Sequence, residues 1–420
     1  MPVRFVPMLA ASVFSLLATV GGAFPNPIEP TRSDAFSELD AVMESGIADG
    51  LYPGGVLVVG TPGEILWAQP YGRVSWEDDA ATVTLDTIYD LASVSKVVGT
   101  ATGAWLMLGE DELSLSDPVE EHIAGFGTEG KETVTIKELM THTSGLKAYD
   151  SRDRVEALRR PGETHADALI RAYAALPASY TPRESYTYSC LNFQTLARIV
   201  ENAAGKRLET LLVERVFGPM GMNDTRYLLS AEQLARTAPT HRDAAGKPVS
   251  GTIHDPLASY HGAEAHCPGN AGLFGTAPDL AKYCAMVLQD GAWEGGQLIP
   301  AEVMREAKRS QIGSELGEER GLGWDVFESR KWVTPLNSEE GERVIGHLGY
   351  TGTMLWLDQR TGTYFVMLTN RTLPRERRAG DQAPSINAVR GEVCQVVLRG
   401  LTEYEGQFFG GEEKTAGGGL

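Results

Sequence analysis

The sequence predicts an α+β fold, an α/β/α sandwich in which an antiparallel sheet is flanked by terminal helices and carries an inserted, mainly helical domain. Two observations predict it. Strand pairs separated by short turns occur near both ends of the chain, and residues between about 110 and 290 show mostly helical patterns. Strands joined by hairpins pair antiparallel, which disfavours a doubly wound parallel sheet. We expect a site in the crevice between the two parts.

The first elements build one part of the predicted sheet. Apolar residues at helical spacing predict a helix over 34–49. Residues 56–59 and 65–68 are strand-like and flank a turn at 60–63 that contains Gly and Pro. A helical pattern follows over 93–108 and ends at a glycine. These elements predict a helix, a hairpin and a second helix.

The rest of the chain supplies the inserted helices and the closing strands. Helical patterns occur at 136–140, 166–175, 193–204, 208–217 and 279–289. A second hairpin is predicted from 354–357 and 364–368, and a closing helix from 391–401. We therefore assign the sheet domain to 35–105 plus 321–402, the mainly helical inserted region to 106–320, and a disordered tail rich in Gly and Glu to 406–420.

Composition and charge exclude several classes of partner. The chain has 420 residues, of which 42% are hydrophobic and 22% charged, so it carries enough apolar surface for a packed core. Its 56 acidic and 37 basic residues give a net charge of -19. Nucleic acid phosphates repel such a chain, and an anionic membrane surface does not attract it. We expect neither as a partner.

The N-terminus has the pattern of a secretory signal peptide. Arg4 precedes an uncharged run over 5–20, and small residues follow at 21–23. The alternative is an uncleaved anchor, but the run of about 16 residues is short for a spanning helix, which needs about 20. We expect residues 1–23 to be removed, a periplasmic or secreted location, and no stable membrane span afterwards.

Two groups of residues could indicate a disulfide scaffold or a metal centre. Four cysteines in 420 residues are too few for a scaffold, so we interpret most of them as free and buried, with any pairing left open. Ligand-type side chains also gather in one segment, at His254, Asp255, His261, His266 and Cys267. Their spacing matches no zinc motif, so a loop ordered by these side chains is favoured. We expect no metal and no cofactor.

The first chemical motif is a serine three residues before a lysine, a pattern that is weak evidence when taken alone. Ser93 and Lys96 open a helical pattern, so both side chains lie on one face and within reach of each other. A lysine so placed can activate the hydroxyl, and the helix N-terminus stabilises negative charge that develops nearby. The same spacing occurs at Ser144 and Lys147, but that segment has the composition of a loop. Ser95 is the local alternative nucleophile, but it would point to another helix face from Lys96, so we favour Ser93 as the nucleophile.

Two further motifs follow Ser93 along the chain. Tyr188 lies just before the predicted helix at 193–204, close to Cys190 and Asn192. A tyrosine near a lysine can accept a proton, although the spacing alone favours a tyrosine packed at a helix start. The glycine-rich segment 346–352 precedes a predicted strand, where a backbone N–H could bind an oxyanion.

These motifs, in this order, resemble the serine β-lactamase and penicillin-binding-protein superfamily, and more closely its class C-like branch of β-lactamase-related serine hydrolases. The resemblance covers about residues 35 to 402 and includes further segments that look like family sequence, at 88–96, 135–146, 216–225, 272–277, 321–324, 346–353 and 368–371. It favours a catalytic over a packing role for Tyr188. The superfamily's fold, an antiparallel sheet with flanking helices and a helical domain, agrees with the one predicted above.

The resemblance also implies roles for individual residues. Ser93 would be the acylated nucleophile, Lys96 its general-base partner, and Tyr188 the relay of the proton to the leaving group. The N–H groups of Ser93 and Tyr350 would form the oxyanion hole. His347, Leu348 and Gly349 stand where many β-lactamases have Lys-Thr-Gly.

Two residues depart from the superfamily's pattern. Cys190 stands where Asn or Asp is usual, a substitution that Asn192 could offset, and a nucleophilic role for Cys190 is disfavoured. His347 replaces a lysine that would attract the carboxylate of a β-lactam, and histidine is mostly neutral at pH 7. This favours esters or peptides as substrates.

Together these observations predict a secreted serine hydrolase that acts on ester or amide carbonyls through an acyl-enzyme, of the esterase, D-alanyl carboxypeptidase or D-amino-acid peptidase type. Its partner would be a small-molecule ester, a peptide or a cell-wall fragment. The alternatives are a weak β-lactamase or an acyltransferase, and a non-catalytic binder of cell-wall peptide. A metal hydrolase that uses the 254–267 cluster is the remaining alternative.

Overall fold

The computed structural model describes residues 24–262, 267–326, 344–373 and 385–409. The predicted signal peptide at 1–23 and the predicted tail from 410 onward lie outside the described residues. Helix α13 spans Ile386–Phe409, so the closing helix is longer than predicted and its backbone extends into the segment assigned to the tail. Among the described residues, no helix combines the length and the apolar character needed to span a bilayer.

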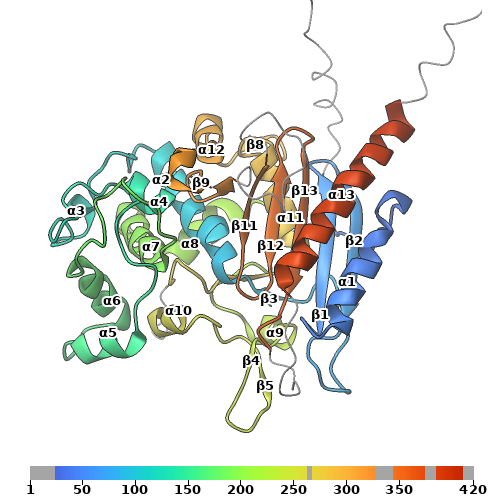
Figure 1. The fold of residues 1–420 in the computed structure, drawn as a ribbon, viewed down its shortest axis with the longest axis horizontal. Helices are drawn as coiled ribbons and strands as arrows, with labels where there is room; N and C mark the ends of the chain where they lie inside the picture. Colours follow the sequence, from blue (N-terminus) through green and yellow to red (C-terminus); the bar gives the residue numbers. More distant parts are fainter. Residues whose placement is uncertain (1–23, 263–266, 327–343, 374–384, 410–420) are drawn as a thin grey trace, which may run out of the picture.

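A seven-stranded antiparallel sheet joins the two ends of the chain (Figure 1). Strand β1 (Gly54–Thr61) pairs on one side with its hairpin partner β2 (Glu64–Gly72) and on the other with β13 (Thr363–Thr369), where Gly55 lies opposite Thr369. In spatial order the strands are β2 (Glu64–Gly72), β1 (Gly54–Thr61), β13 (Thr363–Thr369), β12 (Met354–Asp358), β11 (Val344–Leu348), β10 (Asp325–Val326) and β9 (Glu319–Arg320).

Alternation along the strands divides the interior into two cores. Val56 and Val58 of β1 pack on one face and Leu57 on the other, as the two-residue period of a strand requires. Helices α1 (Glu38–Ala48) and α13 lie side by side over the second face (Figure 1), and α11 (Ala277–Leu288) packs against the first. The three layers are those of the predicted α/β/α sandwich.

The residues between β2 and β9 form most of the remaining helices and three short strand pairs. The helices are α2 (Thr102–Gly109), α3 (Val119–His122), α4 (Ile136–Thr141), α5 (Arg152–Leu158), α6 (His165–Ala174), α7 (Cys190–Ala204), α8 (Leu208–Leu212), α9 (Ala231–Ala235), α10 (Pro256–His261) and α12 (Ala301–Lys308). The strand pairs are β3 (Tyr89–Asp90) with β6 (Phe274–Gly275), β4 (His241–Arg242) with β5 (Pro248–Val249), and β7 (Ala292–Trp293) with β8 (Gly296–Gln297).

Three predicted helices are less regular than their patterns indicate. The first helix is preceded by a separate 3-10 turn at Asp34–Phe36, and α8 continues as a π-helical turn at Val213–Phe217. The pattern from Ser93 to Leu108 divides into a 3-10 turn (Ala92–Val94), a π-helical segment (Lys96–Ala101) and α2. Periodicity detects that one face is apolar, but it does not separate α-helix from these tighter and wider turns.

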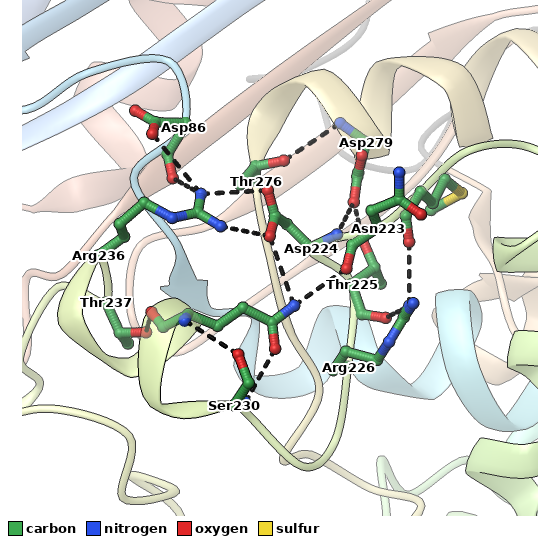
Figure 2. A network of polar contacts seen from close by, with 12 residues as sticks. Asp86, Asn223, Asp224, Thr225, Arg226, Ser230, Arg236, Thr237, Thr276 and Asp279 are labelled. Atoms are coloured by element: carbon green, nitrogen blue, oxygen red, sulfur yellow. Dashed lines mark hydrogen bonds and ion pairs between the residues drawn. The ribbon is translucent and has the colours of Figure 1, made fainter.

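A polar network fixes the segment that leads into β3 and the Ser93 turn (Figure 2). Arg236 pairs with Asp224 at 2.5 Å and donates to the carbonyl of Asp86 at 2.8 Å. The carboxylate of Asp279 accepts the N–H of Asp224 at 2.9 Å, which ties this network to the start of α11. The carbonyl of Arg236 in turn accepts the N–H of Ile88 at 3.0 Å. The approach to Ser93 is therefore anchored on the inserted region.

Candidate active site

Ser93 lies on a turn that a buried carboxylate holds in place. Ala92 has a φ of 47°, a left-handed conformation that L-residues seldom adopt. Asp90 accepts the N–H of Ala92 through Oδ1 and the N–H of His254 through Oδ2, both at 2.8 Å. Asp90 thus links the turn to the chain before α10. The turn brings Ser93 Oγ within 3.1 Å of Lys96 Nζ.

The ammonium of Lys96 is buried and surrounded by acceptors. It donates to Ser93 Oγ, to the carbonyl of Asn270 at 2.8 Å and to Cys190 Sγ at 3.6 Å. Its nitrogen lies 4.9 Å from the centre of the Tyr188 ring. Burial disfavours the charged form, but Cys190 and Tyr188 favour it by more, so the pKa of Lys96 lies above its usual value. Lys96 is therefore a cation at neutral pH.

Tyr188 lies among rings and cations from four parts of the chain. His142, directly after α4, lies 4.6 Å from it between ring centres, and His347 of β11 lies at 6.2 Å. The guanidinium carbon of Arg320 lies 5.3 Å from the centre of the Tyr188 ring. Burial lowers the pKa of His142 well below its usual value, so this neighbour is neutral.

Arg320 forms a buried ion pair at the edge of the sheet. It lies opposite Asp325 in the β9–β10 pair, and the two side chains are 2.5 Å apart. Its Nε and Nη2 both donate to the hydroxyl of Tyr186, at 3.0 and 2.5 Å. Arg320 is 1% exposed. Its charge is therefore fixed in position and shielded from water.

The loop between β11 and β12 docks onto the Ser93 turn. Thr353 Oγ1 donates to the carbonyl of Leu91 at 3.0 Å, and Arg390 of α13 donates to the carbonyls of Gly349 and Thr353 at 2.7 and 2.8 Å. Tyr350 in this loop is 64% exposed and stacks on His254 at 5.5 Å between ring centres. Residues from both ends of the chain therefore hold this loop beside Ser93.

His347 is buried and neutral. Burial lowers its pKa to about 3, more than the nearby Asp325 raises it. Its Nδ1 lies 3.0 Å from the carbonyl of Leu348. The expectation that this position carries no positive charge at neutral pH agrees with its surroundings.

A cleft of about 740 Å³ collects most of the predicted site residues. It contains Ser93 and Tyr188, which precede β9 in the chain, and His347, Gly349 and Tyr350 from β11 and the loop after it. Its walls also include Tyr186, Leu348, Glu318, Arg320, Asp325, Arg371, Ser385, Ile386, Asn387 and Arg390. Residues from the sheet and from the segments between β2 and β9 therefore line the same cleft.

The structure places the remaining predicted residues elsewhere or in other pairings. Asn192 is buried at the start of α7, where its Oδ1 accepts from Ser144 at 2.6 Å, so its recorded partners do not include Lys96. Lys147 pairs with Asp150 at 2.8 Å. The alternative Ser144–Lys147 motif is therefore engaged in other contacts.

The 254–267 cluster provides no metal-binding group among the residues that the structure describes, and the four cysteines form no disulfide. Within the described ranges, which omit 263–266 and hence His266, no group of three or more His, Cys, Asp or Glu could hold a metal ion. All four cysteines are free. Cys267, Cys284 and Cys394 are buried, as expected, whereas Cys190 is half-buried beside Lys96.

Sequence reasoning missed several residues that shape this cleft. They are Asp90, His142, Asn270, Arg320, Asp325 and Arg390. Arg320 directly precedes the family-like segment 321–324, and His142 lies inside the one at 135–146, so both were adjacent to a detectable signal. Asn270 takes part through its carbonyl, which no side-chain motif reveals.

Comparison with known proteins identifies similar chains over most of this length. The family model named Beta-lactamase matches residues 39–386. A putative D-alanyl-D-alanine carboxypeptidase of Escherichia coli O157:H7 is 26% identical over 352 residues, which cover 77% of this chain and 79% of the relative. The N-acetylmuramyl-L-alanine amidase of Bacillus subtilis strain 168 is 25% identical over 402 residues, covering 87% and 90%.

Solved structures share the fold. EstCE1, described as a hydrolase with promiscuous acyltransferase activity, has a TM-score of 0.69 at 19% identity and covers 86% of this chain and 98% of its own. A penicillin-binding protein homolog from Caulobacter crescentus has a TM-score of 0.69 at 21% identity, with 89% and 99% covered. The antiparallel sheet with its helical insertion is thus common to these proteins.

Proposed function

This chain belongs to the Beta-lactamase family and is a serine hydrolase, and from that premise we propose that Ser93 attacks ester or amide carbonyls and forms an acyl-enzyme. The observation that carries the proposal is the 3.1 Å contact between Ser93 Oγ and the buried Lys96 Nζ beside a cleft large enough for a small substrate. Tyr188, 4.9 Å from Lys96 by its ring centre, completes the group.

The reaction proceeds in two steps, the acylation of Ser93 and the hydrolysis of the acyl-enzyme. Ser93 Oγ forms a bond to the carbonyl carbon while its proton passes to the Lys96–Tyr188 pair, and the N–H groups of Ser93 and Tyr350 bind the oxyanion. The bond to the leaving alcohol or amine then breaks, and that group takes the proton. Water hydrolyses the resulting ester by the reverse path, which restores the Ser93 hydroxyl.

The substrate class we favour is a small ester or a peptide, including D-alanyl peptides. The carboxypeptidase name of the similar chains and the hydrolase description of EstCE1 support both types. The neutral His347 supports them over β-lactams, because it offers no cation to a β-lactam carboxylate. Export through a cleaved segment at 1–23 is part of the proposal, and N-terminal sequencing of protein purified from the native host tests it.

Covalent labelling tests the nucleophile. We expect a fluorophosphonate to label wild-type protein at Ser93, and Ser93→Ala to abolish the adduct. Ser144→Ala is the matched control because Ser144 shares the motif spacing, and it should still be labelled. Persistent labelling of the Ser93→Ala variant would falsify the assignment.

A substrate panel then identifies the acyl group. We expect p-nitrophenyl esters or D-alanyl-D-alanine peptides to be turned over faster than nitrocefin, and Ser93→Ala to lose each activity. Faster turnover of nitrocefin would contradict the substrate preference while leaving the nucleophile intact.

A further inference from the structure

Tyr188 has a second cation beside it in addition to Lys96. Lys96 Nζ lies 4.9 Å and the Arg320 guanidinium 5.3 Å from the centre of the Tyr188 ring. Lys96 belongs to the Ser93 segment, whereas Arg320 comes from the edge strand β9. Two cations from unrelated parts of the fold therefore converge on one phenol in the cleft.

Arg320 is built into a fixed position. Asp325 holds its Nη1 at 2.5 Å, and the Tyr186 hydroxyl accepts from its Nε and Nη2. The guanidinium stays protonated at every accessible pH, and its burial leaves little water to screen its field. A surface arginine at the same distance would have a smaller effect on Tyr188.

We propose that Arg320 is a positioning residue for the proton transfer, because its fixed charge favours the state in which Lys96 is an ammonium and Tyr188 is a phenolate ready to accept the Ser93 proton. The inference rests on the proposed acyl-enzyme function and assigns the acceptor within the Lys96–Tyr188 pair. It gives a role to a residue outside the three motifs.

Lys96 and Tyr188 share one proton. The pair can exist as amine and phenol or as ammonium and phenolate, and the two states have the same net charge. A permanent cation beside the phenol stabilises the second state, in which Lys96 donates to Ser93 Oγ and the carbonyl of Asn270. His347 does not supply this charge, because it is neutral near pH 7.

Other ionisable groups near the pair must be considered in a pH experiment. His142 and His347 are neutral at the relevant pH, and Asp325 opposes the effect of Arg320 because it carries the opposite charge. The groups that face or act electrostatically on Tyr188, Lys96 or Arg320 among the described residues include Cys190, His142, Tyr186, Asp255, Asp325, His347 and Glu318. Cys190 contacts Lys96, so the measurements are repeated in a Cys190→Ala background, which removes that contact.

The test is the rate of fluorophosphonate labelling of Ser93 between pH 5 and 10. If the phenolate of Tyr188 accepts the proton, the rate rises with pH and reaches a plateau. We expect Arg320→Gln to move the midpoint of this rise upward by about one pH unit, which is about tenfold in rate below the midpoint. Arg320→Lys keeps the charge and should restore most of the shift.

A variant that is expected to shift the midpoint in the opposite direction controls for a general effect on folding. Asp325→Asn removes the opposing charge and should move the midpoint downward. Removal of one partner from a buried ion pair is destabilising, so the double variant Arg320→Gln/Asp325→Asn provides a neutral pair of similar size. It should show an upward shift smaller than that of Arg320→Gln alone.

The outcomes separate the two proposals. A midpoint that stays in place in Arg320→Gln and in the double variant, with only a uniform loss of rate, overturns the role of Arg320. A pH-dependent rise that persists in Tyr188→Phe shows that Tyr188 is not the acceptor, which also overturns the inference, whereas only the loss of Ser93 labelling from wild-type protein would defeat the proposed function. Midpoints that shift in opposite directions in Arg320→Gln and Asp325→Asn support the inference.

Discussion

Asp90 is a carboxylate that is 1% exposed and accepts two backbone N–H groups from different parts of the chain. Burial raises its pKa to about 6, from a usual value of about 4. The folded state therefore binds a proton at Asp90 more tightly than the unfolded state does. Its contribution to stability is complete below about pH 4 and is lost as the pH rises to about 6.

We predict that Asp90→Asn removes this pH dependence. The wild-type contribution corresponds to about 3 kcal/mol between those two pH values. His347, whose pKa is lowered, gives a slope of the opposite sign, but it is present in both proteins and cancels in the difference. Urea unfolding of both proteins at pH 4, 5, 6 and 7 measures that difference. Parallel stability curves would contradict the prediction.

Cys190 is the residue whose role the sequence leaves most open. Its sulfur lies 3.6 Å from Lys96 Nζ, so it contacts one member of the Lys96–Tyr188 pair that is proposed to accept the proton. We predict that Cys190→Ala retains Ser93 labelling, with a rate within about tenfold of wild type, because it removes one contact of 3.6 Å to Lys96 and leaves the contact between Lys96 and Ser93 in place. Mass mapping of the labelled peptide decides the matter, since loss of the adduct in this variant would favour a cysteine nucleophile.

At the scale of elements, the loop between β11 and β12 requires a glycine, which has no side chain, at position 349. A Cβ at Gly349 would lie 1.9 Å from Thr353 Oγ1 and 2.7 Å from the carbonyl of Leu91. The loop could then no longer dock on the Ser93 turn through Thr353. Glycine is therefore required here by close approach, and Tyr350, the next residue, shares that constraint.

We predict that Gly349→Ala lowers the rate of Ser93 labelling by about 100-fold, because small displacements of groups that position a reaction have effects of this size. Gly296→Ala on β8 is the matched control, since a Cβ there meets its nearest atom only at 3.6 Å. Circular dichroism verifies that both variants fold. A labelling rate within threefold of wild type in folded Gly349→Ala would refute the proposed constraint.

At the scale of the whole molecule, sequence patterns predicted the layers better than the site. The hairpins at 56–68 and 354–368 became the four adjacent strands β2, β1, β13 and β12 because their alternation already encoded two buried faces. The motif residues Ser93, Lys96 and Tyr188 lie together, although their catalytic roles stay predictions. Arg320 and Tyr186 are 134 positions apart, and their contact exists only after β9 joins the sheet.

Sequence patterns also did not predict the backbone conformation next to Ser93. The spacing of Ser93 and Lys96 predicted their proximity, but not the positive φ of Ala92. That conformation is enforced by Asp90 and by the chain near His254, which no local propensity describes.

The packing of the two chain ends can be tested apart from the site. Gly400 of α13 lies against the turn at Asp34–Phe36, where an added Cβ would meet Phe36 Cε1 at 2.5 Å and the carbonyl of Ala35 at 2.6 Å. We predict that Gly400→Leu lowers the free energy of unfolding by about 1–3 kcal/mol through overpacking. Thr402→Ala, at an exposed position of the same helix, should change it by less than about 0.5 kcal/mol. Urea unfolding measures both, and the rate of Ser93 labelling without denaturant should stay at the wild-type level in each. Unchanged stability of Gly400→Leu would show that α13 and the N-terminal turn do not form the tight contact that closes the sheet face.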